Sequence, residues 1–396
     1  MEATRVRRYF CMNSCMTAPP SRYSKHAPAI AKVKLRFPLT KSGSSKNTQH
    51  IVLDTRELSL QFDVGDSVGI YPQNDPILVD HILSTVRATG EEIIVDPKTI
   101  TQISVREFFT HKANLSRLTS SFLKLFYERG SSSFLEPLLQ KENREILVRY
   151  LQEHDPLALL KEMKDVAIPL QDLCNAFSPL LPRFYSIASS PCMHPDEVHL
   201  VVALFTYTHS GEKRYGVASH FLNTLVQEKV TPIPLFVQPA HQFRLTQNDH
   251  APIIMIGPGA GIAPFRAFLQ ERIARNAPGK NWLFFGERNR ATDFFYQEFF
   301  EELAVQKKLK LDLAFSRDQS EKVYVQHRMQ EQAKMLWEWL QEGAYLYVCG
   351  DAEHMAKDVE ATLHGIAKEQ GGMSEEQAAS YFKTLRLENR YMRDVY

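Results

Sequence analysis

The chain has 396 residues, enough for two or three domains with substantial hydrophobic cores. Its hydrophobic content of 44% and charged content of 23% are those of an ordinary globular protein. The formal net charge is +1, so the overall charge favours neither nucleic acid nor an acidic membrane as a partner.

The cysteines and the hydropathy argue against a metal centre and against membrane insertion. The cysteines are odd in number and form no paired CxxC set: Cys11, Cys15, Cys174, Cys192 and Cys349. We therefore predict no zinc or iron–sulfur site and a reducing, cytoplasmic location. No run approaches the roughly 18 apolar residues that span a bilayer. The basic start MEATRVRRYF is not followed by the apolar segment of a secretory signal.

The first part of the chain changes pattern twice. Residues 1–28 are rich in serine, proline and basic residues without a period, which predicts an arm or linker. From Ala29 onward, nearly alternating β-branched stretches separated by polar turns predict an antiparallel β-barrel. Apolar residues at helical spacing between about 74 and 180 predict a helical insertion, after which strands resume. We assign residues 29–248 to this domain.

The last part of the chain, residues 249–396, alternates strands with helices. Short apolar runs such as PIIMIG and AYLYVCG fit strands that are buried on both faces. Helical stretches such as FRAFLQERIAR lie between them. This alternation predicts an α/β domain with a doubly wound parallel sheet.

The first motif begins at Arg183 and reads RFYSIASS. An arginine can grip a phosphate with two parallel charge-assisted bonds. Alternation along a strand places Tyr185 on the same face, where its ring can cover a flat heterocycle, and Ser186 adds a hydroxyl beside it. The alternative is a strand that runs into a polar turn.

The second motif, Tyr215 to Leu222, reads YGVASHFL. Small residues that open a helical run leave backbone N–H groups free to meet a pyrophosphate. The alternative is an ordinary helix that is capped near Ser219.

The third motif is the glycine-rich turn GPGAGIAPFR, which follows the buried strand PIIMI. A strand, a glycine turn and a helix form the context in which the backbone can approach a dinucleotide pyrophosphate. The spacing is not GxGxxG, so a purely structural turn between strand and helix stays open.

The fourth motif, SRDQSEKVYVQ, follows the strand KLDLAF. Two cations, a hydroxyl and a tyrosine can hold a ribose 2′-phosphate and stack on adenine, which would select NADPH over NADH. A solvated charged loop is the alternative.

Near the end of the chain, Cys349 follows a strand and Tyr396 is the last residue. Taken by itself, Cys349 would be read as a buried core residue and Tyr396 as a frayed chain end.

In this order the motifs resemble the FAD/NADPH half of the diflavin reductase family, which shares its core with ferredoxin–NADP reductases. The resemblance runs from about residue 21 to the end of the chain. The stretches YPQNDP, SRDQSEKVYVQ and VCGDAEHMAKDVE, and the ending RYMRDVY, are most similar to the sulfite reductase branch of that family.

The resemblance implies a role for each matching residue. It implies that FAD is bound by Thr110, Arg183, Phe184, Tyr185, Ser186, Val201, Val202, Ala203, Tyr207, Gly216, Val217, Ala218 and Ser219. It implies that NADPH is bound by Gly259, Gly261, Ser316, Arg317, Lys322, Val323, Tyr324, Val325, Gln326 and Asp358. It further implies a catalytic polar cluster of Ser186, Cys349 and Asp394, and an aromatic shield over the flavin formed by Tyr396.

Two departures from the family pattern stand out. Ala260 occupies a position in the glycine turn where the family usually has threonine, which removes one hydroxyl from the nucleotide site. The sequence shows no flavodoxin-like domain, so FMN is not expected on this chain.

We therefore predict hydride transfer from NADPH to FAD, and then electron transfer to a separate acceptor. That acceptor is a siroheme sulfite reductase subunit, or a separate FMN, flavodoxin or ferredoxin protein. A stand-alone NADPH-dependent ferredoxin or flavodoxin reductase is the first alternative. A non-catalytic FAD-binding interaction module is the second.

Overall fold

The computed structural model describes residues 22–130, 134–209 and 212–396. These residues fall into two compact units. The first unit comprises the described residues up to Val68 together with Tyr185–Ala203 and Leu235–Tyr396. The second unit comprises Gly69–Phe184 and Leu204–Pro234.

Most of the predicted N-terminal arm, residues 1–28, lies outside the described residues, and so do Cys11 and Cys15. In the part that is described, Ser24 and Ala27 form an antiparallel bridge. The first strand then begins at Ala29, where the alternating pattern starts.

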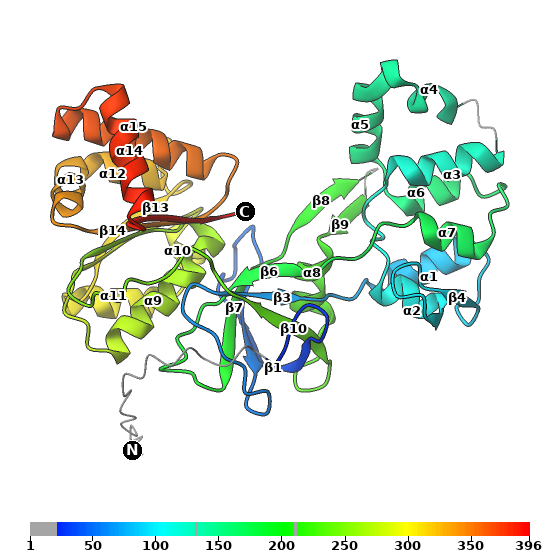
Figure 1. Ribbon diagram of the computed structural model, residues 1–396, viewed down its shortest axis with the longest axis horizontal. Helices are drawn as coiled ribbons and strands as arrows, with labels where there is room; N and C mark the ends of the chain where they lie inside the picture. The colour runs from blue at the N-terminus through cyan, green and yellow to red at the C-terminus, as the bar shows by residue number, and fades with distance from the viewer. Residues whose placement is uncertain (1–21, 131–133, 210–211) are drawn as a thin grey trace. The chain divides into compact units, whose positions relative to one another are not determined.

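A six-stranded sheet holds the strands that the sequence assigned to a barrel (Figure 1). Its strand order is β6-β3-β10-β1-β2-β7. The β1–β2 and β2–β7 pairs are antiparallel. The first half of β1 alternates buried and exposed residues, as a strand with one face in the core must. The strands are β1 (Ala29–Pro38), β2 (Thr48–Asp54), β3 (Ser67–Ile70), β6 (Arg183–Ser186), β7 (Glu197–Ala203) and β10 (Ile233–Gln238).

Closure of this sheet into the predicted barrel is not confirmed. Strands β6 and β7 stand at opposite ends of the strand order, and within the described residues no ladder joins them. A backbone hydrogen bond of 2.8 Å from Ala188 to the carbonyl of His199 does connect the segment after β6 with β7.

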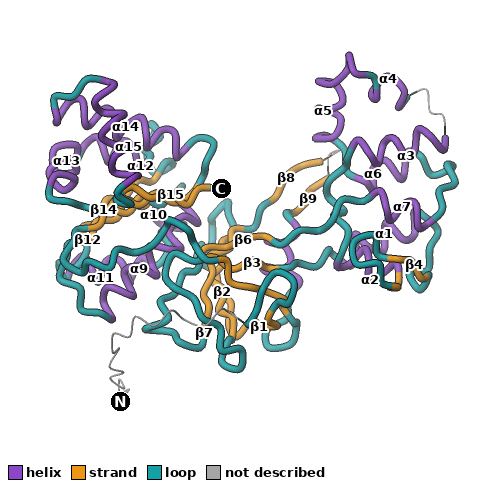
Figure 2. The backbone as a smooth tube through the Cα atoms, in the orientation of Figure 1, coloured by secondary structure: helices purple, strands orange, loops and turns teal. Residues whose placement is uncertain are grey.

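The second unit is mostly helical, and its helices occupy the stretch where the sequence predicts them (Figure 2). Helix α1 begins at Pro76 because Asp75 caps it, accepting a hydrogen bond of 2.9 Å from the backbone of Ile77. A short antiparallel pair, β4–β5, was not predicted. The elements are α1 (Pro76–Thr85), β4 (Ile93–Val95), β5 (Gln102–Ser104), α2 (Val105–His111), α3 (Ser120–Gly130), α4 (Leu135–Leu139), η1 (Lys141–Asn143), α5 (Arg144–Glu153), α6 (Pro156–Glu162), α7 (Leu170–Ala176), β8 (Thr206–His209), β9 (Glu212–Tyr215), α8 (Val217–His220) and η2 (Phe221–Leu225).

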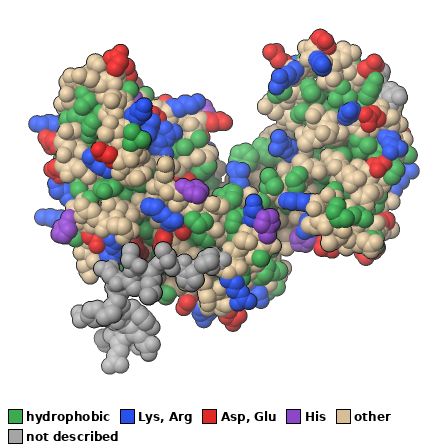
Figure 3. Space-filling model, viewed as in Figure 1, with side chains coloured by type: hydrophobic (Ala, Val, Ile, Leu, Met, Phe, Trp, Pro, Cys, Tyr) green, Lys and Arg blue, Asp and Glu red, His purple; other side chains and the backbone are tan. Residues whose placement is uncertain are grey.

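Surface properties agree with the composition. Acidic and basic side chains are interspersed on the face shown in Figure 3, as the small net charge suggests. Among the described helices, none has both the length and the hydrophobicity that crossing a bilayer requires.

The predicted parallel sheet is confirmed. Its order is β13-β12-β11-β14-β15, and every neighbouring pair is parallel. Alternate residues of one strand enter different cores: Ile253 and Met255 face one cluster, whereas Ile254 faces the other. The strands are β11 (Ile253–Ile256), β12 (Asn281–Glu287), β13 (Lys310–Phe315), β14 (Tyr345–Gly350) and β15 (Tyr391–Val395).

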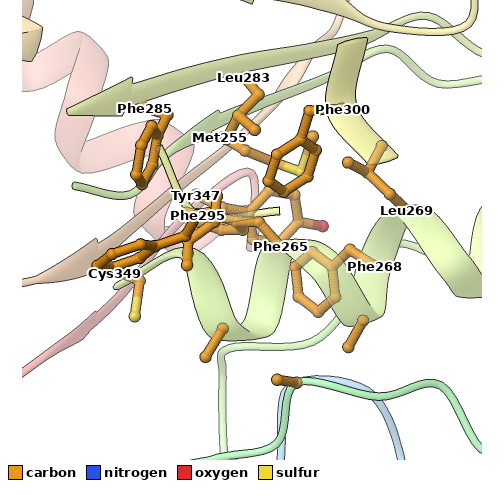
Figure 4. Close-up of a cluster of buried hydrophobic side chains, with 14 of the residues drawn as sticks. Met255, Phe265, Phe268, Leu269, Leu283, Phe285, Phe295, Phe300, Tyr347 and Cys349 are labelled. Carbon is orange, nitrogen blue, oxygen red and sulfur yellow. The ribbon is translucent and has the colours of Figure 1, made fainter. Parts of the chain in front are cut away.

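Helices cover both faces of this sheet. One core contains side chains from α9 and α11, including Phe268 and Phe300 (Figure 4). The other contains side chains from α12 to α15, including Leu336 and Leu363. The elements are η3 (Gly259–Ile262), α9 (Ala263–Ala274), α10 (Arg290–Asp293), α11 (Gln297–Val305), α12 (Val325–Glu331), α13 (Ala333–Gln341), α14 (Met355–Gly371) and α15 (Glu375–Leu387).

Candidate functional site

The order of the parallel sheet marks where a ligand belongs. Moving outward from β11, the chain first proceeds through β12 and β13 on one side, and then returns to β14 on the other. Open α/β sheets bind ligands beyond the carboxyl ends of the strands at such a switch point. The glycine turn leaves β11 there, and Gly350 ends β14 beside it.

The glycine turn has the predicted context of strand, turn and helix. Gly259 adopts a φ of +59°, which L residues with a side chain rarely do. A Cβ on Gly261 would collide with the backbone carbonyl of Cys349. Ala260 packs against the neighbouring core cluster. The turn therefore needs glycine at position 261 to bring its backbone close to β14. Because its two glycines carry no side chains, the backbone of the turn is accessible to a ligand.

The three residues of the predicted polar cluster come together in the first unit. The hydroxyl of Ser186, at the end of β6, donates a hydrogen bond of 2.6 Å to Oδ2 of Asp394. The thiol of Cys349 lies 3.8 Å from the same oxygen. The parallel register of β14 and β15 pairs Cys349 directly with Asp394.

The thiol of Cys349 is a neutral hydrogen-bond donor. Its side chain is fully buried, and burial raises its pKa well above the ordinary value. The carboxylate of Asp394 raises that pKa further, because a thiolate would lie beside a like charge. The cluster thus presents one half-buried carboxylate that accepts hydrogen bonds from a hydroxyl and a thiol.

The C-terminus is held by backbone hydrogen bonds, so the alternative of a frayed end does not hold. The backbone N–H of Tyr396 donates to the carbonyl of Gly350 at 3.1 Å, and Ala352 donates to the carbonyl of Tyr396 at 3.2 Å. The side chain of Tyr396 is 61% exposed. Its ring is therefore held at the carboxyl end of β14 and remains accessible.

The loop after β13 presents two exposed cations, Arg317 and Lys322. Within the described residues, neither side chain makes an ion pair or a hydrogen bond. Asp318 does not neutralise Arg317, because its carboxylate accepts hydrogen bonds from the Arg290 backbone and the Asn289 amide. Unpaired cations beside a half-exposed ring, Tyr324 (42% exposed), form a surface that suits a phosphate and a flat base.

The remaining residues of that motif divide into two groups. The side chain of Val325 is buried in the core and that of Val323 packs against the same cluster, so any ligand contact from them must come from the backbone. Gln326 donates a hydrogen bond of 3.1 Å to the exposed Asp358 on α14. The hydroxyl of Ser316 is bonded to the carbonyl of Glu287 at 3.3 Å.

Strands β6 and β7 carry several of the residues that the resemblance assigned to FAD. Arg183 is exposed and, in the described part of the chain, its guanidinium has no partner. Phe184 is 50% exposed and Tyr185 is partly buried. Val201 and Val202 are buried, and within the described residues β7 is the last strand of the sheet, paired with β2.

In the second unit the turn before α8 binds itself together. Ser219 donates to the carbonyl of Gly216 at 3.0 Å and accepts from the backbone of Phe205 at 3.1 Å. The hydroxyl of Ser219 is therefore engaged, and so is the backbone N–H of Gly216, which donates to the carbonyl of Phe205 at 2.9 Å. The turn can present the backbone N–H groups of Val217 and Ala218, which open helix α8. Thr110 likewise donates to its own helix, to the Arg106 carbonyl at 2.7 Å. The ring of Tyr207 is partly buried, and burial raises its pKa.

Two further interactions beside the switch point were not predicted. Arg266, on the helix after the glycine turn, donates to the carbonyl of Ala188 at 2.6 Å and so fixes the segment that carries Ser186. Glu287, at the end of β12, is buried and forms an ion pair with the partly exposed Lys46. Its Oε1 lies 3.5 Å from where a Cβ on Gly259 would lie. Lys46 neutralises a carboxylate that would otherwise repel a phosphate. Neither pairing follows a local sequence pattern.

A buried histidine network surrounds Arg266. The arginine lies 3.3 Å from Nδ1 of His199, whose Nε2 contacts Glu197 at 2.8 Å. His194 and His199 with Glu197 could hold a metal ion, because their ligand atoms lie within 4.8 Å of one another. Glu197, however, is already paired with Lys34. Burial, with Arg266 as a further cause, lowers the pKa of His50 to about 2 and that of His199 to about 4.

These histidines predict that acid destabilises the protein. The ordinary pKa of a histidine is 6.5, so in the unfolded chain they take up protons that the folded protein excludes. Stability should therefore fall as the pH drops below about 6.5, by about 1.4 kcal/mol per pH unit for each histidine. Urea unfolding at pH 7 and pH 5.5 measures this. His50→Gln should reduce the pH dependence, whereas a change at the exposed His81 should not. If the free energy of unfolding depends on pH equally in both variants, the buried His50 is not a cause of the acid destabilisation.

The site fits two nucleotide cofactors. A glycine turn that a Cβ would fill, and exposed cations without partners among the described residues, supply what pyrophosphate and phosphate groups require. These features are typical of proteins that bind flavin and nicotinamide nucleotides.

Comparisons with known proteins agree with this class. Residues 21–221 match the FAD binding domain, and residues 255–361 match the oxidoreductase NAD-binding domain. The chain belongs to the family that is built on this FAD binding domain. Both predicted cofactor-binding domains are thereby confirmed.

Curated relatives carry the name sulfite reductase (NADPH) flavoprotein alpha-component. The chain is 41% identical over 391 residues to that of Shewanella sp. (strain MR-4), covering 97% of this chain and 63% of the relative. It is 42% identical over 378 residues to that of Vibrio cholerae, with 95% and 60% covered. It is 39% identical over 380 residues to that of Bacillus subtilis, with 95% and 62% covered. The chain thus spans less than two thirds of the length of these relatives.

Proposed function

We propose that the chain is an NADPH-dependent FAD reductase that passes electrons to a separate acceptor protein. The observation that carries the proposal is the meeting of Ser186, Cys349 and Asp394 beside the glycine turn at the switch point. When bound, FAD supplies an acceptor for hydride and a donor of single electrons, while the protein supplies orientation, electrostatics and exclusion of water.

The polar cluster acts on the nicotinamide end of the nucleotide. A nicotinamide ring gains positive charge as hydride leaves, and a fixed carboxylate stabilises that charge without having to reorganise. Asp394 supplies the carboxylate. Ser186 orients it through its 2.6 Å hydrogen bond, and the neutral thiol of Cys349 adds no charge of its own.

The loop after β13 selects NADPH. Arg317 and Lys322 bind the 2′-phosphate, Ser316 helps to hold the loop, and the ring of Tyr324 stacks on adenine. The exposure of both cations and their lack of partners within the described residues support this assignment. Gln326 and Asp358, already bonded to each other, border the site, and Val323 and Val325 support it from the core.

We assign FAD to the residues that the family resemblance marked. Arg183 binds its phosphate, Tyr185 covers the isoalloxazine, and Gly216 to Ser219 meet the pyrophosphate through backbone groups. Contacts of lesser weight come from Thr110, Phe184, Val201, Val202, Ala203 and Tyr207. The FAD domain then spans residues 29–248, as an antiparallel barrel with a helical insertion at 74–180, and the NADP domain spans 249–396. The two family matches, at 21–221 and 255–361, support this division.

The acceptor we favour is the siroheme subunit of a sulfite reductase, because the relatives are named as the flavoprotein component of that enzyme. About 40% of their length has no counterpart in this chain. A separate FMN, flavodoxin or ferredoxin protein is the alternative acceptor.

The direct test is to purify the chain, extract its flavin and measure electron transfer. We expect FAD without FMN, rapid NADPH oxidation with ferricyanide, and slow reduction of cytochrome c until a flavodoxin-type protein is added. Arg183→Ala should lower FAD content, whereas a change at the exposed Arg56, which pairs with Asp54, should not. Stoichiometric FMN in the extract, or no NADPH oxidation by the FAD-loaded chain, would contradict the proposal.

The ring of Tyr396 should compete with nicotinamide for the flavin face. A stacked aromatic pair contributes about 0.5–1.5 kcal/mol beyond area burial. A variant that ends at Val395 should therefore bind NADP⁺ more tightly, by up to about tenfold, and accept NADH more readily. Tyr396→Phe is the matched control, because it keeps the ring. If the truncated chain matches the full chain in NADP⁺ affinity, NADH activity and flavin spectrum, the shield assignment is wrong.

A further inference from the structure

A cavity of about 480 Å³ lies at the edge of the parallel sheet opposite to the glycine turn. Its wall includes Asn281 and Lys310, the first residues of β12 and β13, whereas Gly259 follows the end of β11. Parallel strands all begin at one edge, so the cavity and the nucleotide site are separate. Its apolar part includes Leu269 of α9, Leu303 of α11 and Trp339 of α13.

Every charged side chain among the described residues of the cavity wall is basic. Among the described residues that line the cavity there is no aspartate or glutamate, and the cations are Arg272, Lys280, Lys307, Lys308 and Lys310. Carboxylates outside the wall pair with two of them, Glu342 with Lys280 at 2.8 Å and Asp312 with Lys310 at 3.3 Å. For Lys307 and Lys308, the described part of the chain offers no ion pair.

Arg272, a buried side chain of the wall, has polar atoms that no described residue satisfies. Arg272 is 2% exposed and donates from Nη2 to the carbonyl of Ala251 at 3.1 Å, but its Nε and Nη1 have no hydrogen-bond partner among the described residues. Buried polar groups without partners cost free energy, and native proteins rarely keep them unless something binds there.

We propose that this cavity is a second ligand site that binds a small organic polyanion, with phosphate or carboxylate groups. Its volume lies in the range of small-molecule sites, roughly 300–1,000 Å³. Lys307, Lys308 and Arg272 provide three cations without a paired carboxylate, which matches a ligand of two or three negative charges. A guanidinium N–H group donates a charge-assisted hydrogen bond to a phosphate or carboxylate, and the wall around Trp339 can cover an apolar body.

The test is isothermal titration calorimetry on the full chain, with NADP⁺ at saturation so that the nucleotide site is filled. Pyrophosphate and citrate are titrated separately. The anion with the lower dissociation constant shows whether the site prefers phosphate or carboxylate groups. We expect saturable one-to-one binding of at least one of them. The signal should be accompanied by a change in tryptophan fluorescence, because Trp339 lines the cavity and its ring centroid lies 5.0 Å from that of Trp282.

A pair of double variants separates the cavity from general surface charge. Lys307→Glu with Lys308→Glu should weaken binding by about tenfold or more. Lys334→Glu with Lys383→Glu changes the net charge equally at exposed residues outside the cavity, and should leave binding within about twofold of the original. The KM for NADPH should stay unchanged in both. Absence of saturable binding by either anion, or equal effects of the two double variants, would overturn the proposal.

Discussion

Replacing Arg317 by alanine should raise the KM for NADPH by about one to two orders of magnitude and barely affect NADH. Each charge-assisted hydrogen bond to a phosphate contributes roughly 1.5–3 kcal/mol, and 1.4 kcal/mol corresponds to a factor of ten. The guanidinium of Arg317 is exposed, and the Asp318 carboxylate is bonded to the Arg290 backbone. Loss of the guanidinium therefore removes the proposed phosphate contact and breaks no ion pair among the described residues. Steady-state kinetics with both nucleotides measures the effect.

Inhibition by two small nucleotides sharpens this test. In Arg317→Ala the affinity for 2′,5′-ADP should fall by the same factor as the KM for NADPH rises. The affinity for 5′-AMP, which lacks the 2′-phosphate, should stay unchanged. Lys334→Ala removes an exposed cation from the same sheet domain, and should change neither. Equal losses for NADPH and NADH would mean that Arg317 acts on the shared part of the nucleotide or on folding, and would refute its role in selection.

Replacing Asp394 by asparagine should slow hydride transfer by about ten- to a thousandfold while changing NADPH affinity little. The magnitude is that expected for the loss of one preorganised group which stabilises charge in the transition state. Asparagine keeps the shape and can still accept the hydrogen bond from Ser186, so the change mainly removes the negative charge. Stopped-flow measurement of flavin reduction separates this step from release of product.

Controls distinguish a catalytic effect from a structural one. Glu388→Gln neutralises an exposed carboxylate six residues earlier, paired only loosely with Arg390 at 3.6 Å, and should leave the rate unchanged. Cys349→Ala should slow the reaction less than Asp394→Asn, because the thiol is neutral and lies 3.8 Å from the carboxylate. An unchanged rate of flavin reduction in Asp394→Asn would remove this residue from the catalytic cluster.

Short-range features of the fold were predictable because they depend on neighbouring residues. The continuous apolar run PIIMI predicts a strand that is buried on both faces, and Ile253 and Ile254 do enter different cores. The glycines that follow predict the turn, because glycine favours the positive φ of Gly259 and a Cβ on Gly261 would collide with the backbone of β14. The helical spacing after residue 74 predicts helices, although their ends and the β4–β5 pair were not foreseen.

The tertiary structure alone decided which distant residues meet. Ser186 and Asp394 are 208 positions apart, and their hydrogen bond depends on the packing of β6 against the end of β15, which no local period encodes. For the same reason the sequence did not indicate that Arg266 would hold Ala188, that Lys46 would neutralise Glu287, or that Arg272 would be buried beside a basic cavity. Local patterns determine elements and turns, because they act over a few residues. Contacts between elements depend on the registers and side-chain packing of the whole fold.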